Sequence, residues 1–372
     1  SDNLKKIIFF FFFNKYKNSK TIINSMKETL PGTLRIKTKD LQVYEKTKSS
    51  WKKSKVKFPN ASQVIKLFKK SKNLKSLIDK NDPNFLKGQL SSEGKCQGAR
   101  INILPNNKTL DKAYSLFANH LTIHDQKSNE HWDVLLQNPG GTYAYIYTLD
   151  KKSKAKLRKY KKVKEFDKHY PLIKRKVTLA LKNKNDHLAL PMYTLLNTYM
   201  RVGNEIYFKA HGHKGLTTLK KKDIKIKGKE VTFNYLAKDG VPRTIKKNFP
   251  PNYLRRLNKK LKDLKTDSFV FTGPNGHPLK DTKFKEAFKS YCGKEFYPHI
   301  VRSHHASLRA REFLKTHKTT NKKEMKEFFL SLAQDLGHKK FSKKENIWKE
   351  SYTVTLNHYV DPELVEKIRA LV

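Results

Sequence analysis

Five side chains in the C-terminal half have the types that metal-free phosphoryl transfer needs. They are two arginines, a lysine, a histidine and a tyrosine, at positions Arg201, Lys238, Arg302, His338 and Tyr359. Each is expected at the end of a helix or strand or at its start, where the backbone is held more firmly than in a long loop. Their spacing along the chain is wide, so the fold has to bring them together.

The chemistry of these groups explains why they belong together. A tyrosine hydroxyl, with a pKa of about 10, is a poor nucleophile toward a phosphodiester unless the two non-bridging oxygens are neutralised. Two bidentate arginines and a histidine can do this without a metal. A lysine next to the phosphate can protonate a departing deoxyribose 5′-oxygen as a general acid. The set predicts phosphoryl transfer on DNA with neither a cofactor nor a metal.

Longer motifs surround the five residues and follow one another in a specific order. They are Arg201-Val202-Gly203-Asn204-Glu205-Ile206-Tyr207, Gly215-Leu216-Thr217-Thr218-Leu219, Val231-Thr232-Phe233, Ala237-Lys238-Asp239-Gly240, Arg302-Ser303-His304-His305-Ala306, Leu336-Gly337-His338 and Tyr359-Val360-Asp361-Pro362. This succession resembles the type IB DNA topoisomerases of the compact poxvirus and bacterial kind. The resemblance runs from about Lys161 to the C-terminus.

The resemblance implies a role for each of the five residues. Tyr359 attacks one strand of duplex DNA and forms a 3′-phosphotyrosyl link. Arg201, Arg302 and His338 hold the scissile phosphate. Lys238 protonates the departing 5′-oxygen, and the nicked strand rotates and is resealed without ATP or a metal. The implied partner is double-stranded DNA, bound by a monomeric clamp.

Two features depart from the family pattern. His338 precedes Tyr359 by 21 positions instead of a short segment, and residues 339–349 look like an inserted basic loop. Tyr352 therefore competes with Tyr359 as the nucleophile, although the Tyr-x-x-Pro continuation into a final helix favours Tyr359. Ala237 stands where the family usually has glycine before the lysine. This difference bears on the geometry of the expected turn and leaves the assignment of Lys238 unchanged.

Two other functions fit part of the pattern. A tyrosine recombinase or integrase uses the same kind of catalytic set, and His299-Ile300-Val301-Arg302 fits its His-x-x-Arg box. The segments at 201–204 and 215–219 favour the topoisomerase, because recombinases lack them. A non-enzymatic basic DNA-binding protein would bind DNA with strong salt dependence and form no covalent adduct, and only the charge supports it.

The composition agrees with a DNA-binding protein inside a cell. Lys and Arg number 81 against 33 Asp and Glu in 372 residues, which gives a formal net charge of +48. Nucleic acids are the commonest intracellular polyanions able to balance such a charge. Cys96 and Cys292 cannot form a disulfide framework and indicate a reducing compartment. We expect no membrane span, and an intracellular location with DNA in a nucleus, a nucleoid or a viral factory.

The hydrophobic pattern predicts an α+β chain in three parts. Residues 1–30 are interpreted as a disordered extension, since their phenylalanine run lacks a signal-peptide cleavage site. Residues 31–150 form a small N-terminal α+β domain with short strands and a basic helix over 64–77, and the resemblance implies that this domain is half of the DNA clamp. A lysine-rich stretch over 151–164 then opens the catalytic domain, 151–372.

The catalytic domain is expected to be mostly helical, with one small sheet. Two-residue alternation over 224–245, with turns at Lys227-Gly228 and Asp239-Gly240, predicts a three-stranded antiparallel meander. Helical periodicity marks a buried face from Met192 to Tyr199. It resumes in four later stretches, at 254–264, 284–291, 301–314 and 325–336, the last of which Gly337 can cap, and a closing helix follows at 363–371.

A further pattern lies in the N-terminal domain. His124-Asp125, followed by His131-Trp132-Asp133, faintly resembles the core of the 3′-phosphoesterase modules attached to some DNA ligases, in which His and Asp bind a metal. The alternative is an ordinary hydrogen-bonded strand pair. Because the match is short, the strand pair is the favoured interpretation.

Overall fold

The chain folds into two compact units. The computed structural model describes residues 29–124, 131–138 and 141–372. One unit ends at Lys156 and the other begins at Leu157. Both contain helices and antiparallel sheets, so the predicted α+β class is confirmed. The extension expected at 1–30 lies almost wholly outside the described residues. In the described part, no helix is long and apolar enough to cross a membrane.

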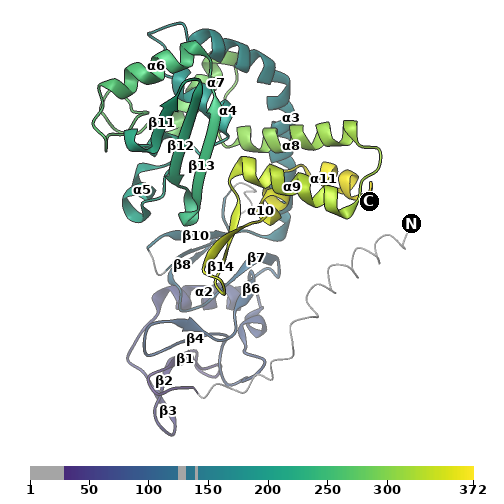
Figure 1. Cartoon of the computed structure of the whole chain (residues 1–372). Helices are drawn as coiled ribbons and strands as arrows, with labels where there is room; N and C mark the ends of the chain where they lie inside the picture. Colours follow the sequence, from purple (N-terminus) through teal and green to yellow (C-terminus); the bar gives the residue numbers. More distant parts are fainter. Residues whose placement is uncertain (1–28, 125–130, 139–140) are drawn as a thin grey trace. The chain divides into compact units, whose positions relative to one another are not determined.

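Short antiparallel strands dominate the first unit (Figure 1). The largest sheet has the order β3-β2-β1-β4-β5, a second has the order β10-β9-β8, and β6 pairs with β7. The strands are β1 (Leu34–Ile36), β2 (Val43–Lys46), β3 (Trp51–Lys53), β4 (Gln89–Leu90), β5 (Cys96–Gln97), β6 (Ile101–Ile103), β7 (Thr109–Tyr114), β8 (Asn119–Ile123), β9 (Val134–Gln137) and β10 (Tyr143–Ile146).

The helix of the first unit begins earlier than the sequence pattern predicts. α2 (Pro59–Lys70) opens with proline at its first position, where no backbone N–H is needed. Its buried face repeats at helical spacing and consists of Ala61, Val64, Ile65 and Phe68. The chain then turns through Lys72, at φ 53°, into a 3₁₀ turn at Leu74–Leu77. The predicted single helix over 64–77 is thus wrong: a left-handed residue separates two elements.

The lysine-rich stretch at 151–164 is helical. It lies within α3 (Leu149–Ala180), whose 32 residues include the boundary between the two units. Lysine is a good helix former, and large apolar side chains recur every three or four positions. The buried ones are Tyr160, Val163, Phe166, Ile173 and Val177.

A three-stranded antiparallel meander lies in the second unit, as predicted. It consists of β11 (Ile224–Lys227), β12 (Glu230–Leu236) and β13 (Pro242–Asn248), in that order. Val231, Phe233 and Tyr235 alternate along β12 and are buried in the larger core. A short turn at Lys238–Gly240 joins β12 to β13, and Asp239 adopts φ 65° there.

Helices form most of the rest of the second unit. They are α4 (Ala189–Thr198), α5 (Glu205–His211), α6 (Pro251–Lys262), α7 (Asp281–Cys292), α8 (Ile300–Thr316), α9 (Lys322–Leu336), α10 (Thr353–His358) and α11 (Pro362–Arg369). The four predicted stretches from 254 to 336 correspond to α6, α7, α8 and α9. In Figure 1, α8 and α9 run side by side, and α11 packs against α8. These three helices enclose the smaller core.

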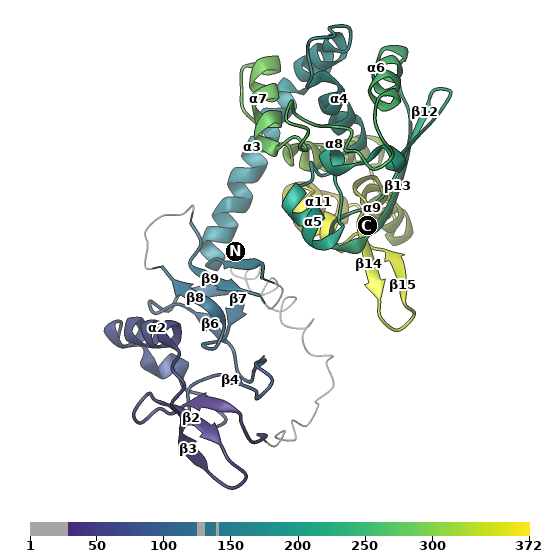
Figure 2. The same cartoon turned by 90° about the vertical axis from the view of Figure 1, so that its left-hand side faces the viewer.

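The segment expected to be an inserted basic loop is a β-hairpin. β14 (Lys339–Ser342) pairs with β15 (Ile347–Glu350), and the ribbon projects from the end of α9 (Figure 2). Phe341 and Trp348 face each other across the strands with ring centroids 5.3 Å apart. Such cross-strand aromatic pairs stabilise short hairpins. Because the hairpin returns to its starting point, it shortens the effective connection from His338 to α10.

Candidate active site

Side chains of α3 hold the backbone on both sides of Tyr359, which lies between α10 and α11. Lys159 Nζ donates a hydrogen bond to the carbonyl of His358. The Tyr160 hydroxyl donates to the carbonyl of Val360 at 2.6 Å. Tyr359 itself is only 4% exposed. The position of this tyrosine therefore depends on residues about 200 positions earlier in the chain.

Arg201 lies in the loop after α4, and close backbone packing fixes it. The amide of Leu216 donates to the Arg201 carbonyl at 2.8 Å. Gly203 adopts φ +98°, in the left-handed region that favours glycine. Gly215 approaches so closely that a Cβ there would lie 2.6 Å from the Arg201 carbonyl oxygen. The segments at 201–207 and 215–219 therefore pack directly against each other.

Gly215→Ala should strongly destabilise the protein. The added Cβ would meet backbone atoms of Arg201 and Gly203, which cannot rotate away, so we expect a loss of about 2–4 kcal/mol in the free energy of unfolding. Urea unfolding measures it. Gly273→Ala is the control, because its Cβ would come no closer than 3.3 Å, to the flexible side chain of Asn275. Equal stabilities of the two variants would contradict the packing argument.

Arg302 and His338 form a buried hydrogen-bonded pair. Arg302 on α8 is fully buried and donates to the carbonyls of Tyr199 and Leu336, at the ends of α4 and α9. Its Nη2 also lies 2.9 Å from His338 Nε2. A guanidinium can only donate, so Nε2 is the acceptor and the imidazole is neutral. The proton on Nδ1 is then donated to Thr355 Oγ1, at 2.7 Å.

Arg243 on β13 connects the ends of the same two helices. Its Nη2 donates to the carbonyl of Asp335 at 2.7 Å and to that of Thr198 at 3.3 Å. Gly337 leaves room for it, since a Cβ there would lie 2.7 Å from the arginine side chain. Gly337 also caps α9 in the left-handed conformation that the sequence predicted. Arg243 therefore helps to fix the direction in which His338 leaves the helix.

The cations around Tyr359 change the acidity of its phenol. Arg201 Nη2 donates to the Tyr359 hydroxyl at 3.2 Å, and Arg302 Cζ lies 4.9 Å from the ring centroid. Burial raises the pKa of Tyr359, but Arg302, Arg201 and Lys159 together outweigh it, so that the pKa falls below its ordinary value. In the described part of the chain, every other tyrosine with a shifted pKa has it raised. This environment favours the phenolate.

Two histidines next to the tyrosine should make the protein acid-labile. Burial, followed by repulsion from Arg302 and Arg201, lowers the pKa of His299 to about 3 and that of His338 to about 2. The unfolded chain, with an ordinary pKa of about 6.5, takes up these protons first as the pH falls. Stability is therefore lost below about pH 6.5, by roughly 2–4 kcal/mol between pH 7 and pH 5.

Urea unfolding at pH 5, 6 and 7 measures this loss. His299→Gln removes one of the two groups and should flatten the dependence on pH. A free energy of unfolding that stays constant or rises toward pH 5 would contradict the prediction.

Lys238 is not part of this contact cluster. It begins the turn between β12 and β13, where it is exposed, and no hydrogen bond or ion pair joins it to the other four residues. Its charge nevertheless contributes, after burial, Arg302, Arg201 and Lys159, to the lowered pKa of His299. His299 packs against Tyr359 with ring centroids 5.3 Å apart. Lys238 therefore lies within electrostatic range of the cluster.

Tyr352 has a different environment from Tyr359. It precedes α10 and stacks on Phe329, with ring centroids 5.9 Å apart, at the edge of the smaller core. No hydrogen bond or cation–π contact links it to Arg201, Arg302 or His338 in the described structure. Its surroundings are those of a packing residue.

The histidine and aspartate pattern of the first unit contains a strand pair. The amide of His124 donates to the carbonyl of Asp133 at 3.0 Å, next to the pairing of β8 with β9. The Asp133 carboxylate pairs with Lys151 at 2.5 Å and accepts from the amide of Thr148 at 2.8 Å. Asp125 lies outside the described residues. The described residues include no group of three or more side chains arranged to hold a metal.

Several residues of the site were not found from the sequence. Lys159, Tyr160, Arg243 and Thr355 contact the predicted residues or their backbone, but a basic or hydroxyl residue in a helix or strand carries no local signal of such a contact. In a chain with 81 Lys and Arg, only the fold distinguishes these from surface side chains. His299 had a signal in its spacing to Arg302, which we assigned to the recombinase alternative.

Comparison with known proteins gives three findings. A family model described as "Eukaryotic DNA topoisomerase I, catalytic core" matches residues 149–361. The "DNA topoisomerase 1B" of Acanthamoeba polyphaga mimivirus is 25% identical over 202 residues, which cover 50% of this chain and 60% of that protein. A solved structure of the XerH site-specific recombinase bound to its difH substrate overlaps 45% of this chain and 46% of that one, at 17% identity. Its TM-score of 0.31 is too low to support an argument.

Proposed function

The chain belongs to the family of the eukaryotic DNA topoisomerase I catalytic core, and on this premise we propose that it relaxes supercoiled duplex DNA as a type IB topoisomerase. The matched region contains all five residues singled out in the sequence. The mimivirus relative supports the subtype by its name. The match spans 60% of that relative's length, so the activity of the whole chain is part of the proposal.

Arg201, Arg302 and His338 bind the scissile phosphate in this proposal. Arg302 Nε is buried without a hydrogen-bond partner, a cost that an anionic acceptor next to this guanidinium would remove. In the described structure, no carboxylate makes an ion pair with Arg201 or Arg302, so their charges are not already neutralised. A phosphate oxygen takes the place of His338 Nε2 as acceptor for Arg302, and the negative charge then favours a proton on that nitrogen.

Tyr359 is the nucleophile of the proposed reaction. Its Oη forms a bond to phosphorus and the bond from phosphorus to the 5′-oxygen breaks, which leaves a 3′-phosphotyrosyl link. The phenol proton is lost to solvent, and Lys238 gives a proton to the departing 5′-oxygen. Resealing is the reverse reaction after the free strand has rotated. The cationic side chains supply the charge that the transition state needs, with no requirement for ATP or a metal.

The observation that carries the proposal is the environment of one phenol. Tyr359 is buried between two arginines, and its pKa is lowered although burial opposes this. Burying a phenol next to two unpaired guanidinium groups is costly unless an anion binds there, and a phosphodiester fits this requirement.

The wider parts of the proposal concern DNA binding. A net charge of +48 favours DNA as the partner and predicts an affinity that falls steeply with salt. We propose that the first unit contributes backbone contacts as the second half of a clamp, that the protein acts as a monomer, and that it works inside the cell where the DNA is.

Plasmid relaxation tests the proposed function. We expect purified protein to relax both positively and negatively supercoiled plasmid in EDTA, without nucleotide, in steps of linking number. A requirement for magnesium or ATP would contradict the mechanism. Binding without relaxation under all conditions would favour a non-enzymatic basic DNA-binding protein.

A further inference from the structure

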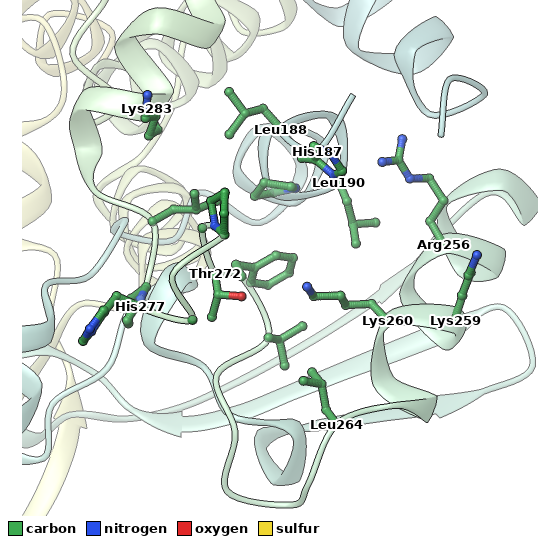
Figure 3. A pocket seen from close by; sticks show the side chains of 18 of the residues that line it. His187, Leu188, Leu190, Arg256, Lys259, Lys260, Leu264, Thr272, His277 and Lys283 are labelled. Carbon is green, nitrogen blue, oxygen red and sulfur yellow. The ribbon is translucent and has the colours of Figure 1, made fainter. Parts of the chain in front are cut away.

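A large cavity of the described structure lies in the second unit (Figure 3). Its volume is about 1470 Å³. The walls come from the end of α3 and the start of α4, from α6, and from residues 270–286. No residue of the Tyr359 cluster lines it. Pockets for small molecules usually measure about 300–1,000 Å³, so this space can hold several side chains of a peptide.

The floor of the cavity is apolar. Leu188 and Leu190 at the start of α4, Leu264 after α6, and Phe271 and Leu279 on the following segment contribute to it. Leu188, Leu264 and Leu279 remain partly exposed although they pack against the larger core. Covering this surface with apolar side chains would contribute about 25 cal/mol per Å².

The rim is cationic, and most of its charges are unpaired. Lys182, Lys184, Lys259, Lys260 and Lys280 make no ion pair within the described residues. Figure 3 shows Lys260 reaching from α6 across the cavity toward Thr272.

Arg256 has a different role in the wall. It donates to the carbonyls of Ala180, Asn183 and Asp186 and thereby fixes the chain between α3 and α4. The wall is thus held in place while the lysines stay available for a ligand.

We propose that this cavity binds an acidic segment of a partner protein that carries large apolar side chains. An apolar floor within a ring of free lysines is complementary to a peptide with an apolar face and flanking carboxylates. A nucleic acid backbone matches the lysines but would leave the floor uncovered. We name this surface the α6 cavity.

The α6 cavity is lined by residues other than the reacting groups. β13 begins beside the Lys238 turn and ends at Asn248, just before α6. A seven-residue strand spans about 23 Å. The cavity shares no lining residue with the Tyr359 cluster, and the inference does not depend on the proposed function.

Peptide binding tests the proposal. The probe is a fluorescein-labelled peptide of about 16 residues with Leu and Phe at helical spacing and Glu elsewhere. Its control has the same number of Glu residues, with Ser in place of the apolar ones. By fluorescence anisotropy at about 150 mM salt, we expect the apolar peptide to bind at least about tenfold more tightly.

Two charge-matched double variants locate the binding site. Lys259→Glu/Lys260→Glu should weaken binding of the apolar peptide by about tenfold or more, because both side chains line the cavity. Lys262→Glu/Lys265→Glu makes the same change of charge at two exposed lysines that do not line the cavity. This variant should change the affinity for the apolar peptide less than about twofold.

Three results would overturn the proposal. Equal affinity for the two peptides would mean attraction by net charge alone, and so would an equal loss in the two double variants. If Lys259→Glu/Lys260→Glu selectively weakened binding of a labelled 20-base-pair duplex, the cavity would be part of the DNA-binding surface.

Discussion

Tyr359→Phe should abolish DNA cleavage while leaving DNA binding intact. The substitution removes one oxygen, the proposed nucleophile, and keeps the ring that packs against His299 and His338. We expect single-turnover cleavage to fall by at least about 10⁴-fold, because among the described tyrosines Tyr359 is the one whose hydroxyl accepts a hydrogen bond from Arg201. Non-covalent binding, measured by electrophoretic mobility shift, should change less than about twofold.

Tyr352→Phe is the matched control for this prediction. It removes the same atom from Tyr352, which lies seven positions before Tyr359 and packs on Phe329. Its cleavage rate should stay within about threefold of the unmodified protein. If Tyr352→Phe abolished cleavage and Tyr359→Phe did not, the nucleophile would be misassigned.

Lys238→Ala should slow cleavage by about 10²–10⁴-fold, the range expected when a general acid is lost. The exposed position of Lys238 on a short turn gives it no packing role, so stability should hardly change. A DNA substrate with a 5′-bridging phosphorothiolate should restore most of the rate, because the sulfur leaving group needs no proton.

Lys227→Ala is the control for the lysine. Lys227 is exposed at the other turn of the same meander, between β11 and β12, and should contribute nothing to cleavage. Failure of the phosphorothiolate to rescue Lys238→Ala would remove the general-acid role. If Lys227→Ala slowed cleavage as much as Lys238→Ala, or if the phosphorothiolate also restored its rate, the defect would come from the loss of a positive charge and not from the loss of a specific acid.

Much of the second unit was predictable because its elements have clear periodicity. The meander from 224 to 248 and the helices α6 to α9 alternate or repeat over enough residues to be recognised. The left-handed glycine after α9 was also visible, since Gly337 follows an amphipathic stretch. The first unit was harder, because strands such as β4 and β5 have only two residues each.

The errors have local physical causes. The run of lysines from 151 to 164 marked a boundary and gave no sign of a helix, although Tyr160 and Val163 give it a buried helical face. Residues 339–349 looked like a loop because lysines mask the alternation, while the Phe341–Trp348 pair closes a hairpin. The single helix predicted over 64–77 is interrupted at Lys72, which has a positive φ. Lysine seldom adopts such a φ, so the residue type did not indicate the interruption.

The order of the motifs made the site predictable, whereas the chemistry of the single residues did so only in part. The order of the motifs singled out five residues, and the structure brings Arg201, Arg302, His338 and Tyr359 into contact. Their roles, and that of Lys238, stay predictions. What the sequence did not reveal is how α3 and β13 hold them, because these contacts join residues far apart in the chain.

The most direct test is to identify the residue joined to DNA when cleavage is trapped with denaturant. Protein mixed with a duplex labelled at the 5′ end of the cleaved strand is quenched with detergent, digested with protease and analysed by mass spectrometry. We predict one peptide that contains Tyr359, esterified to a 3′-phosphate. A DNA-linked peptide with a different residue, a 5′-phosphate link, or no covalent product at all would contradict the account.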